Sequence, residues 1–184
     1  IAVKGLYDRE AWARSSYEVF KLIEDCGGKF HISGLENLSK RKGPVVFVCN
    51  HMSTLETMIF PCIIAPVMEV TFVVKESLIK HPVFGPVMRA RKPIVVSRSN
   101  TREDLSAVLD QGTQMLLKDT SIIIFPQTTR KLEFIPEEFN SLGVKLAARA
   151  GAQIIPIAIK TDFWGNGKII KDLGRIDRKK PIYM

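Results

Sequence analysis

The chain alternates between short apolar runs and longer stretches in which apolar and polar residues are mixed. Four runs of about five largely apolar residues are bounded by Gly, Pro or polar residues, a pattern typical of strands buried in a parallel sheet. A fifth apolar run lies near the end, and a short alternating segment, 30–32, precedes them all. The predicted strands are 45–49, 70–74, 93–97, 121–125 and 154–159.

Three of the mixed stretches carry apolar residues at the spacing of amphipathic helices. In the first, Trp12, Phe20 and Ile23 share one face, and Gly27 is placed to end the helix. The second opens on Asn100, with a glutamate three positions later in a capping-box pattern. The predicted helices are 8–25, 101–118 and 140–150.

Strands that alternate with helices predict an α/β fold, with a mostly parallel, at most mixed, sheet flanked by helices. With 184 residues, 46% of them hydrophobic, we expect a single layered domain over residues 1–184. Because the chain opens on Ile1 rather than methionine, we also expect a fragment that lacks terminal residues.

The formal net charge of +8 indicates an anionic partner. Nucleic acid is disfavoured, because aromatic residues are 8% of the chain and are not interleaved with the basic ones. The longest apolar stretch, 58–68, contains two prolines and is too short to span a bilayer, so we expect membrane contact to be peripheral. The tail 168–180 holds six cationic and two anionic residues, which suits either an anionic leaflet or an ordinary solvated segment.

Cysteine usage indicates a reducing compartment. Cys26, Cys49 and Cys62 have neither zinc-site nor disulfide spacing, so we expect a location on the cytoplasmic side of a membrane. Cys49 lies close to a histidine and could be a nucleophile, but a buried structural thiol is the favoured interpretation.

A histidine and a carboxylate follow the first buried run: Glu56 stands five positions after His51. An imidazole can take a proton from an alcohol, while a carboxylate on its other nitrogen fixes the tautomer. The pair therefore predicts a base and its orienting residue, as acyl transfer to a hydroxyl requires. Ser53 and Glu56 also form a capping-box pattern at a helix start. The two interpretations are not exclusive, because a carboxylate has several acceptor sites.

Polar residues follow the carboxyl ends of the predicted strands, where functional groups gather in open α/β sheets. Arginine suits a phosphate there, because its planar fork donates two parallel hydrogen bonds. Each arginine taken singly is better explained as a solvated surface charge, whereas several converging cations predict a phosphate-bearing substrate. The residues at the strand ends are Asn50, His51, Lys75, Glu76, Arg98, Gln127, Thr128, Thr129 and Arg130.

Taken together and in order, four blocks resemble the glycerolipid acyltransferase family, the lysophosphatidate (1-acylglycerol-3-phosphate) acyltransferase-like enzymes. The family has Asn-His followed by four residues and an aspartate, then an arginine after a strand, then Phe-Pro-Glu-Gly-Thr-Arg, and last a proline in a late strand. The matching residues are Asn50, His51 and Glu56; Arg98; Phe125-Pro126-Gln127-Thr128-Thr129-Arg130; and Pro156.

The resemblance implies a glycerol-phosphate acyltransferase-like fold. It also implies transfer of a fatty acyl group from an acyl-CoA or acyl-carrier-protein thioester to a hydroxyl of a lysophospholipid or related phosphate-bearing alcohol. His51 is the implied general base and Glu56 its orienting residue, with no metal and no cofactor besides the thioester co-substrate. The implied substrate-binding residues are Arg98, Arg130, Thr129, Gln127, Thr128 and Lys75.

Two positions depart from the family pattern. Glu56 keeps the charge of the usual aspartate on an arm one methylene longer. Gln127 and Thr128 replace glutamate and glycine, so a carboxylate becomes a neutral amide and a conformationally free residue becomes β-branched. The altered block leaves an alternative function: a non-catalytic or weakly active lipid- or anion-binding relative with the same fold.

Overall fold

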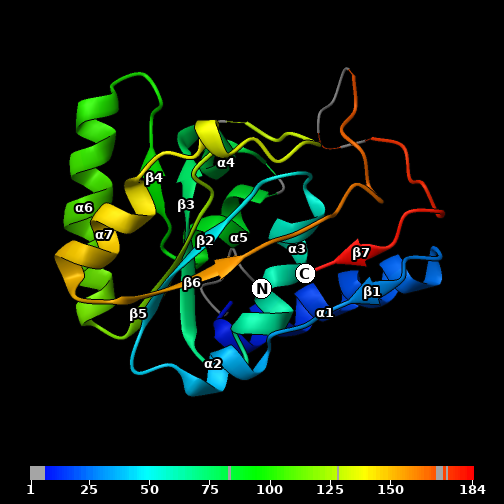
Figure 1. Ribbon diagram of the computed structural model, residues 1–184, viewed down its shortest axis with the longest axis horizontal. Coiled ribbons are helices and arrows are strands. Elements are labelled where there is room, and N and C mark those ends of the chain that lie inside the picture. Colours follow the sequence, from blue (N-terminus) through cyan, green and yellow to red (C-terminus); the bar gives the residue numbers. More distant parts are fainter. Residues whose placement is uncertain (1–6, 83, 128, 169–171, 173) are drawn as a thin grey trace.

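A five-stranded sheet forms the centre of the molecule (Figure 1). The computed structural model describes residues 7–184 except 83, 128, 169–171 and 173. The strand order is β4-β3-β5-β2-β6, and all neighbouring pairs are parallel, which confirms the predicted α/β fold. The strands are β2 (Val45–Cys49), β3 (Glu69–Lys75), β4 (Ile94–Val96), β5 (Thr120–Ile124) and β6 (Gln153–Ile157).

Helices cover both faces of the sheet. The helices α6 (Thr101–Leu117) and α7 (Leu142–Ala150) lie on one face, and α1 (Arg9–Asp25) and α3 (Leu55–Ile64) on the other (Figure 1). The alternation of side chains along a strand divides β2 between two cores. Val45 and Phe47 pack with α1 and α3, and Val46 packs with α6 and α7.

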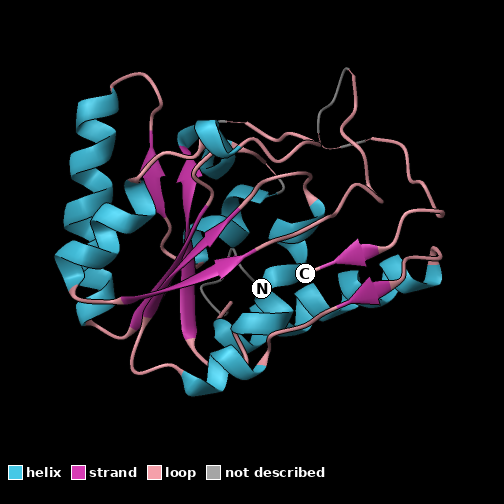
Figure 2. Cartoon of the chain, in the orientation of Figure 1, coloured by secondary structure: helices cyan, strands magenta, loops and turns pink. Residues whose placement is uncertain are grey.

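The three helices expected from the sequence are confirmed as α1, α6 and α7, and their ends have local causes. Asp8 accepts a hydrogen bond from the Ala11 amide at 2.8 Å at the start of α1, and Gly151 ends α7 with φ +64°. Several short elements were not predicted (Figure 2). They are α2 (Glu36–Lys40), α4 (Glu76–Lys80), α5 (Phe84–Ala90), the 3-10 turn η2 (Pro136–Glu138) and β7 (Ile182–Tyr183).

The fifth strand differs from the buried strand that its apolar run suggests. β6 lies at the edge of the sheet with β2 as its neighbour, and Ile154 is 38% exposed. Pro156 is compatible with this position, because an edge strand tolerates a residue without an amide hydrogen. The apolar run alone did not distinguish an edge strand from a central one.

A segment that follows α1 and the C-terminal end of the described chain form a second, two-stranded sheet. β1 (Phe30–His31) pairs in parallel with β7, and Tyr183 also bridges Lys160 beyond β6. In the basic tail, the Lys180 ammonium lies 2.8 Å from the Asp162 carboxylate. No helix within the described ranges is long and apolar enough to cross a membrane.

Candidate active site

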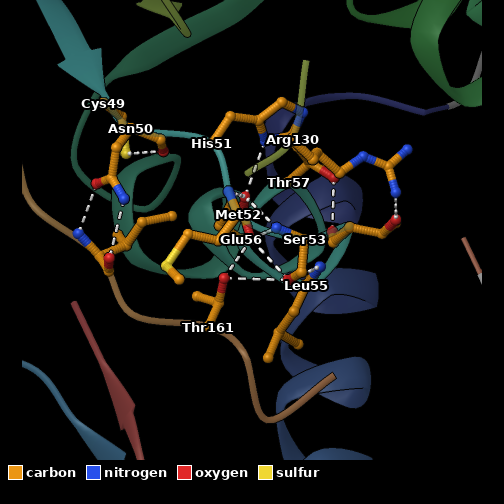
Figure 3. A network of polar contacts seen from close by, with 12 residues as sticks. Cys49, Asn50, His51, Met52, Ser53, Leu55, Glu56, Thr57, Arg130 and Thr161 are labelled. Atoms are coloured by element: carbon orange, nitrogen blue, oxygen red, sulfur yellow. Dashed lines mark hydrogen bonds and ion pairs between the residues drawn. The ribbon is translucent and has the colours of Figure 1, made fainter. Parts of the chain in front are cut away.

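The predicted histidine–carboxylate pair forms directly beyond the end of β2 (Figure 3). His51 Nδ1 lies 2.8 Å from Glu56 Oε1. The Glu56 side chain is fully buried, while that of His51 is 17% exposed. An ionised carboxylate can only accept, so Nδ1 carries the proton and Nε2 keeps a lone pair that can take one. The imidazole stacks on the Phe125 ring at a centroid distance of 4.3 Å, which restricts its orientation.

Further donors converge on the Glu56 carboxylate. The backbone amides of Met52 and Ser53 donate at 2.7 and 2.9 Å, and the Ser53 and Thr161 hydroxyls donate at 2.8 and 2.7 Å. Burial by itself raises the pKa of Glu56, but the hydrogen bonds and charge of His51 and the bonds from Thr161 and Ser53 outweigh it. The net effect is a lowered pKa, so the carboxylate is ionised at neutral pH.

The contacts expected from both interpretations of the Ser53–Glu56 pattern are present together. Glu56 reaches back to the Ser53 amide, and the Leu55 amide donates to Ser53 Oγ at 3.1 Å; Ser53 stands one residue before the N-cap Thr54, whose own side chain makes no capping bond. The same carboxylate orients His51. Since the amides of Met52 and Ser53 both donate to Glu56, the loop that carries the imidazole is bound to the first turn of α3.

Thr161 was not recognised from the sequence. Asn50 brings it to the site by joining the end of β2 to the segment after β6: its amide group donates to the Ile159 carbonyl at 3.0 Å and accepts from the Ile159 amide at 2.8 Å. Two residues later, the fully buried Thr161 reaches Glu56. A signal existed, because Thr161 follows the fifth predicted strand and functional groups gather beyond strand ends.

The segment 125–130, the third of the four blocks, forms a hydrogen bond with the backbone of His51. Gln127 Oε1 accepts from the His51 amide at 2.7 Å, and the Lys131 amide donates to the His51 carbonyl at 2.9 Å. Gln127 is 2% exposed, and its Nε2 is buried without a hydrogen-bond partner in the part of the chain that the structure describes. The Gln127 side chain is thus placed to position His51 rather than to face solvent. Thr129 is exposed, and Thr128 lies outside the described residues.

Arg130 lies beside the loop that joins His51 to Glu56 (Figure 3). Its guanidinium donates to the Thr54 hydroxyl at 2.7 Å and to the Asn166 side-chain oxygen at 3.3 Å. It also forms an ion pair of 2.5 Å with Asp172. Asn166 and Asp172 come from a late segment that no sequence pattern had connected with the site.

The other two predicted cations are exposed and lie farther along the same edge of the sheet. Lys75 ends β3, and Arg98 follows β4, which is three places from β2 in the strand order. At a strand spacing of about 4.8 Å, β4 lies roughly 14 Å from β2. Arg98 has a φ of +62°, and its amide donates to the Asp104 carboxylate at 2.7 Å. The structure therefore brings Arg130 to the loop that joins His51 to Glu56, while Lys75 ends β3 and Arg98 follows β4, strands that lie farther from β2.

Cys49 is a structural residue. Its side chain is fully buried, and burial raises the pKa of the thiol well above its usual range, with the nearby Glu56 charge adding to the effect. A neutral, buried thiol is a poor nucleophile. Over the described residues, no group of three His, Cys, Asp or Glu side chains is arranged to hold a metal ion.

The chain is similar in sequence to known proteins. The 1-acyl-sn-glycerol-3-phosphate acyltransferase of Pseudomonas aeruginosa is 31% identical over 147 residues, which cover 80% of this chain and 54% of that protein. A chloroplastic enzyme of the same name from Arabidopsis thaliana is 28% identical over 142 residues, covering 77% and 38%. The chain thus spans about half the length of these curated relatives, or less.

The fold itself has a solved counterpart. The crystal structure of the 1-acyl-sn-glycerophosphate (LPA) acyltransferase from Thermotoga maritima aligns with a TM-score of 0.71 and 17% identity, covering 97% of this chain and 67% of that one. A family model described as Acyltransferase matches residues 29–160, which include His51, Glu56 and Arg130. The chain therefore belongs to the acyltransferase family.

Proposed function

We propose that the chain transfers a fatty acyl group from an acyl-CoA or acyl-carrier-protein thioester to a hydroxyl of a lysophospholipid or a related phosphate-bearing alcohol. The observation that carries the proposal is the 2.8 Å contact between His51 Nδ1 and the buried, ionised Glu56. Family membership supports it, and so do the relatives that are named 1-acyl-sn-glycerol-3-phosphate acyltransferases.

In the proposed reaction, His51 is the general base. Its Nε2 takes the proton of the acceptor hydroxyl while the hydroxyl oxygen forms a bond to the thioester carbonyl carbon. The carbon–sulfur bond then breaks, and the imidazolium returns the proton to the leaving thiolate. Glu56 stabilises the imidazolium because it is already ionised in contact with the ring. The reaction as written uses no cofactor besides the thioester co-substrate.

We propose that Arg130 is the main residue that binds the acceptor's phosphate, because its guanidinium lies beside the loop that joins His51 to Glu56, the two residues of the proposed catalytic dyad. Three exposed residues, Lys75 at the end of β3, Arg98 after β4 and Thr129 after β5, would surround the anionic parts of the substrates. Gln127 contributes through the His51 backbone.

We also place the chain at the cytoplasmic surface of a membrane, as a peripheral protein. Lysophospholipids partition into bilayers, and a net charge of +8 favours an anionic leaflet.

The test is thiol release from long-chain acyl-CoA and acyl-carrier protein across a panel of lysophospholipids and simple alcohols. Acceptor-dependent release is expected, and His51→Ala should lower it about 100- to 10,000-fold because the general base is lost. His31→Ala is the matched control, since His31 is an exposed histidine that stacks on Tyr183 in the β1–β7 sheet.

A different outcome would contradict the acyltransferase proposal. Folded protein that releases no thiol with any donor or acceptor, and that binds lysolipid equally well with and without His51, is a binding relative rather than an enzyme.

A further inference from the structure

The side chains of Asp172, Arg130 and Thr54 form a ring of polar contacts beside the His51–Glu56 pair. Its Oδ1 pairs with Arg130 Nη2 at 2.5 Å and accepts from the Thr54 hydroxyl at 2.8 Å. The Thr54 oxygen in turn accepts from Arg130 Nη1 at 2.7 Å. Thr54 stands between His51 and Glu56 in the chain, so the ring belongs to the same loop as the dyad.

Asn166, another residue late in the chain, also contacts this loop. The Asn166 amide nitrogen donates to the Met52 carbonyl at 2.9 Å, and its oxygen accepts from Arg130 at 3.3 Å. The Asp172 carboxylate and the Asn166 side-chain oxygen, which accept from Arg130, therefore also contact the loop that joins His51 to Glu56.

The Asp172–Arg130 pair carries no net charge at neutral pH. Burial alone raises the pKa of Asp172, but hydrogen bonds from Thr54 and Arg130 and the Arg130 charge outweigh it and lower the pKa. The Asp172 side chain is 40% exposed and that of Arg130 is 23% exposed, so an incoming solute can reach the pair.

We propose that Asp172 is a specificity-determining residue. Its carboxylate occupies the position on Arg130 where a substrate phosphate would bind, and a phosphomonoester displaces it more readily than a phosphodiester does. The proposal rests on the proposed function, because it takes Arg130 as the phosphate-binding group. A ligand is attracted to Arg130 more strongly than the Asp172 carboxylate is only if the ligand carries more negative charge than that carboxylate. A monoester carries between one and two negative charges at pH 7, as phosphoserine does, while a diester carries one, as the Asp172 carboxylate does.

The test compares lysophosphatidate, a monoester, with lysophosphatidylglycerol, a diester, as acceptors for the wild type and for Asp172→Asn. Asparagine keeps an oxygen that can accept from Thr54 and Arg130 and removes the charge. We expect kcat/KM for the diester to rise about tenfold through KM, equivalent to about 1.4 kcal/mol, with kcat unchanged. The gain for the monoester should be smaller, so the ratio of monoester to diester kcat/KM falls.

The control is Asp110→Asn. Asp110 forms an equivalent surface group, with Arg149 at 2.6 Å and the Ser106 hydroxyl at 2.9 Å, on α6 away from the site. It should leave both acceptors unchanged. An unchanged ratio in Asp172→Asn, or an equal fall in kcat for both acceptors, would show that Asp172 only supports Arg130 and would overturn the proposal.

A binding measurement separates this proposal from the acyltransferase proposal. Calorimetric titrations with glycerol 3-phosphate and glycerophosphoglycerol, in a His51→Ala background, report the headgroup site without catalysis. Asp172→Asn should tighten binding of the diester more than that of the monoester, whether or not the protein transfers acyl groups. Equal changes for the two ligands, or no binding of either by both proteins, overturn the role of Asp172 even in an active enzyme.

Discussion

Two helices of this chain begin with the same polar pattern just after a strand, and they differ in what the pattern does. At the start of α6, Asn100 accepts from the amides of Arg102 and Glu103 at 3.2 and 3.3 Å, and all three residues are exposed. At the start of α3, Glu56 accepts from the Ser53 amide but is fully buried and also contacts His51. The first pattern caps a helix, and the second lies at a helix start and also holds the imidazole of His51.

The difference comes from the strand that precedes each helix. α6 follows β4, an edge strand with β3 as its neighbour, so solvent surrounds the cap. α3 follows β2, which lies between β5 and β6, and the segments beyond those strands supply Gln127 and Thr161. A capping carboxylate becomes an orienting residue where neighbouring strands bury it and add donors.

The largest effect is expected from neutralising Glu56, and the same change at Glu103 is the comparison. Glu56→Gln should lower kcat about 100- to 10,000-fold, because His51 loses the carboxylate that fixes its tautomer and stabilises its charged form. Glu103→Gln should leave kcat unchanged, because Glu103 is exposed at the other helix. Steady-state kinetics on both variants, with circular dichroism to verify folding, makes the measurement.

Glu56→Asp separates chemistry from folding in this experiment. It restores the residue of the family pattern and keeps the charge, so it should retain more activity than Glu56→Gln. Equal activity of the wild type and of Glu56→Gln would mean that Glu56 is a helix cap alone.

A smaller effect is expected at the donor that β6 brings to Glu56. Thr161→Val keeps the shape of the side chain and removes a 2.7 Å hydrogen bond to the carboxylate. A hydrogen bond to a charged group contributes about 1.5–3 kcal/mol, so kcat should fall about tenfold or more, with KM little changed. Thr161→Ser, which keeps the hydroxyl, should restore kcat. A fall in stability with no change in kcat would assign Thr161 a structural role only.

The smallest effect concerns stability against pH. Folding lowers the pKa of Glu56 below the ordinary glutamate value of 4.5, so its ionised form adds stability above about pH 4.5. That contribution is lost as pH falls through the lowered pKa of the folded state. The free energy of unfolding of the wild type should therefore drop more steeply on acidification than that of Glu56→Gln. Urea titrations from pH 3 to pH 7 measure it, with Glu103→Gln as the charge control; parallel curves for wild type and Glu56→Gln would contradict it.

Local features of this protein were predictable from the sequence because their causes lie within a few residues. The apolar run 45–49 became β2 in full, and Asn100 caps α6 through amides two and three positions away. His51 and Glu56 are five positions apart across a strand end and a helix start, so their contact is also local. The contact between the imidazole and the carboxylate therefore follows from the local sequence.

The contacts that complete the site depend on strand order, which the sequence pattern does not specify. Apolar runs look alike whether a strand is central or at an edge, as β2 and β6 demonstrate. The order β4-β3-β5-β2-β6 places β5, the strand before Arg130, beside β2, and places β4, the strand before Arg98, three positions away. Thr161 and Asp172 are separated from their partners by 105 and 42 residues. Contacts over such distances form only when the sheet has closed around β2, because hydrophobic packing rather than local propensity sets which strands are neighbours.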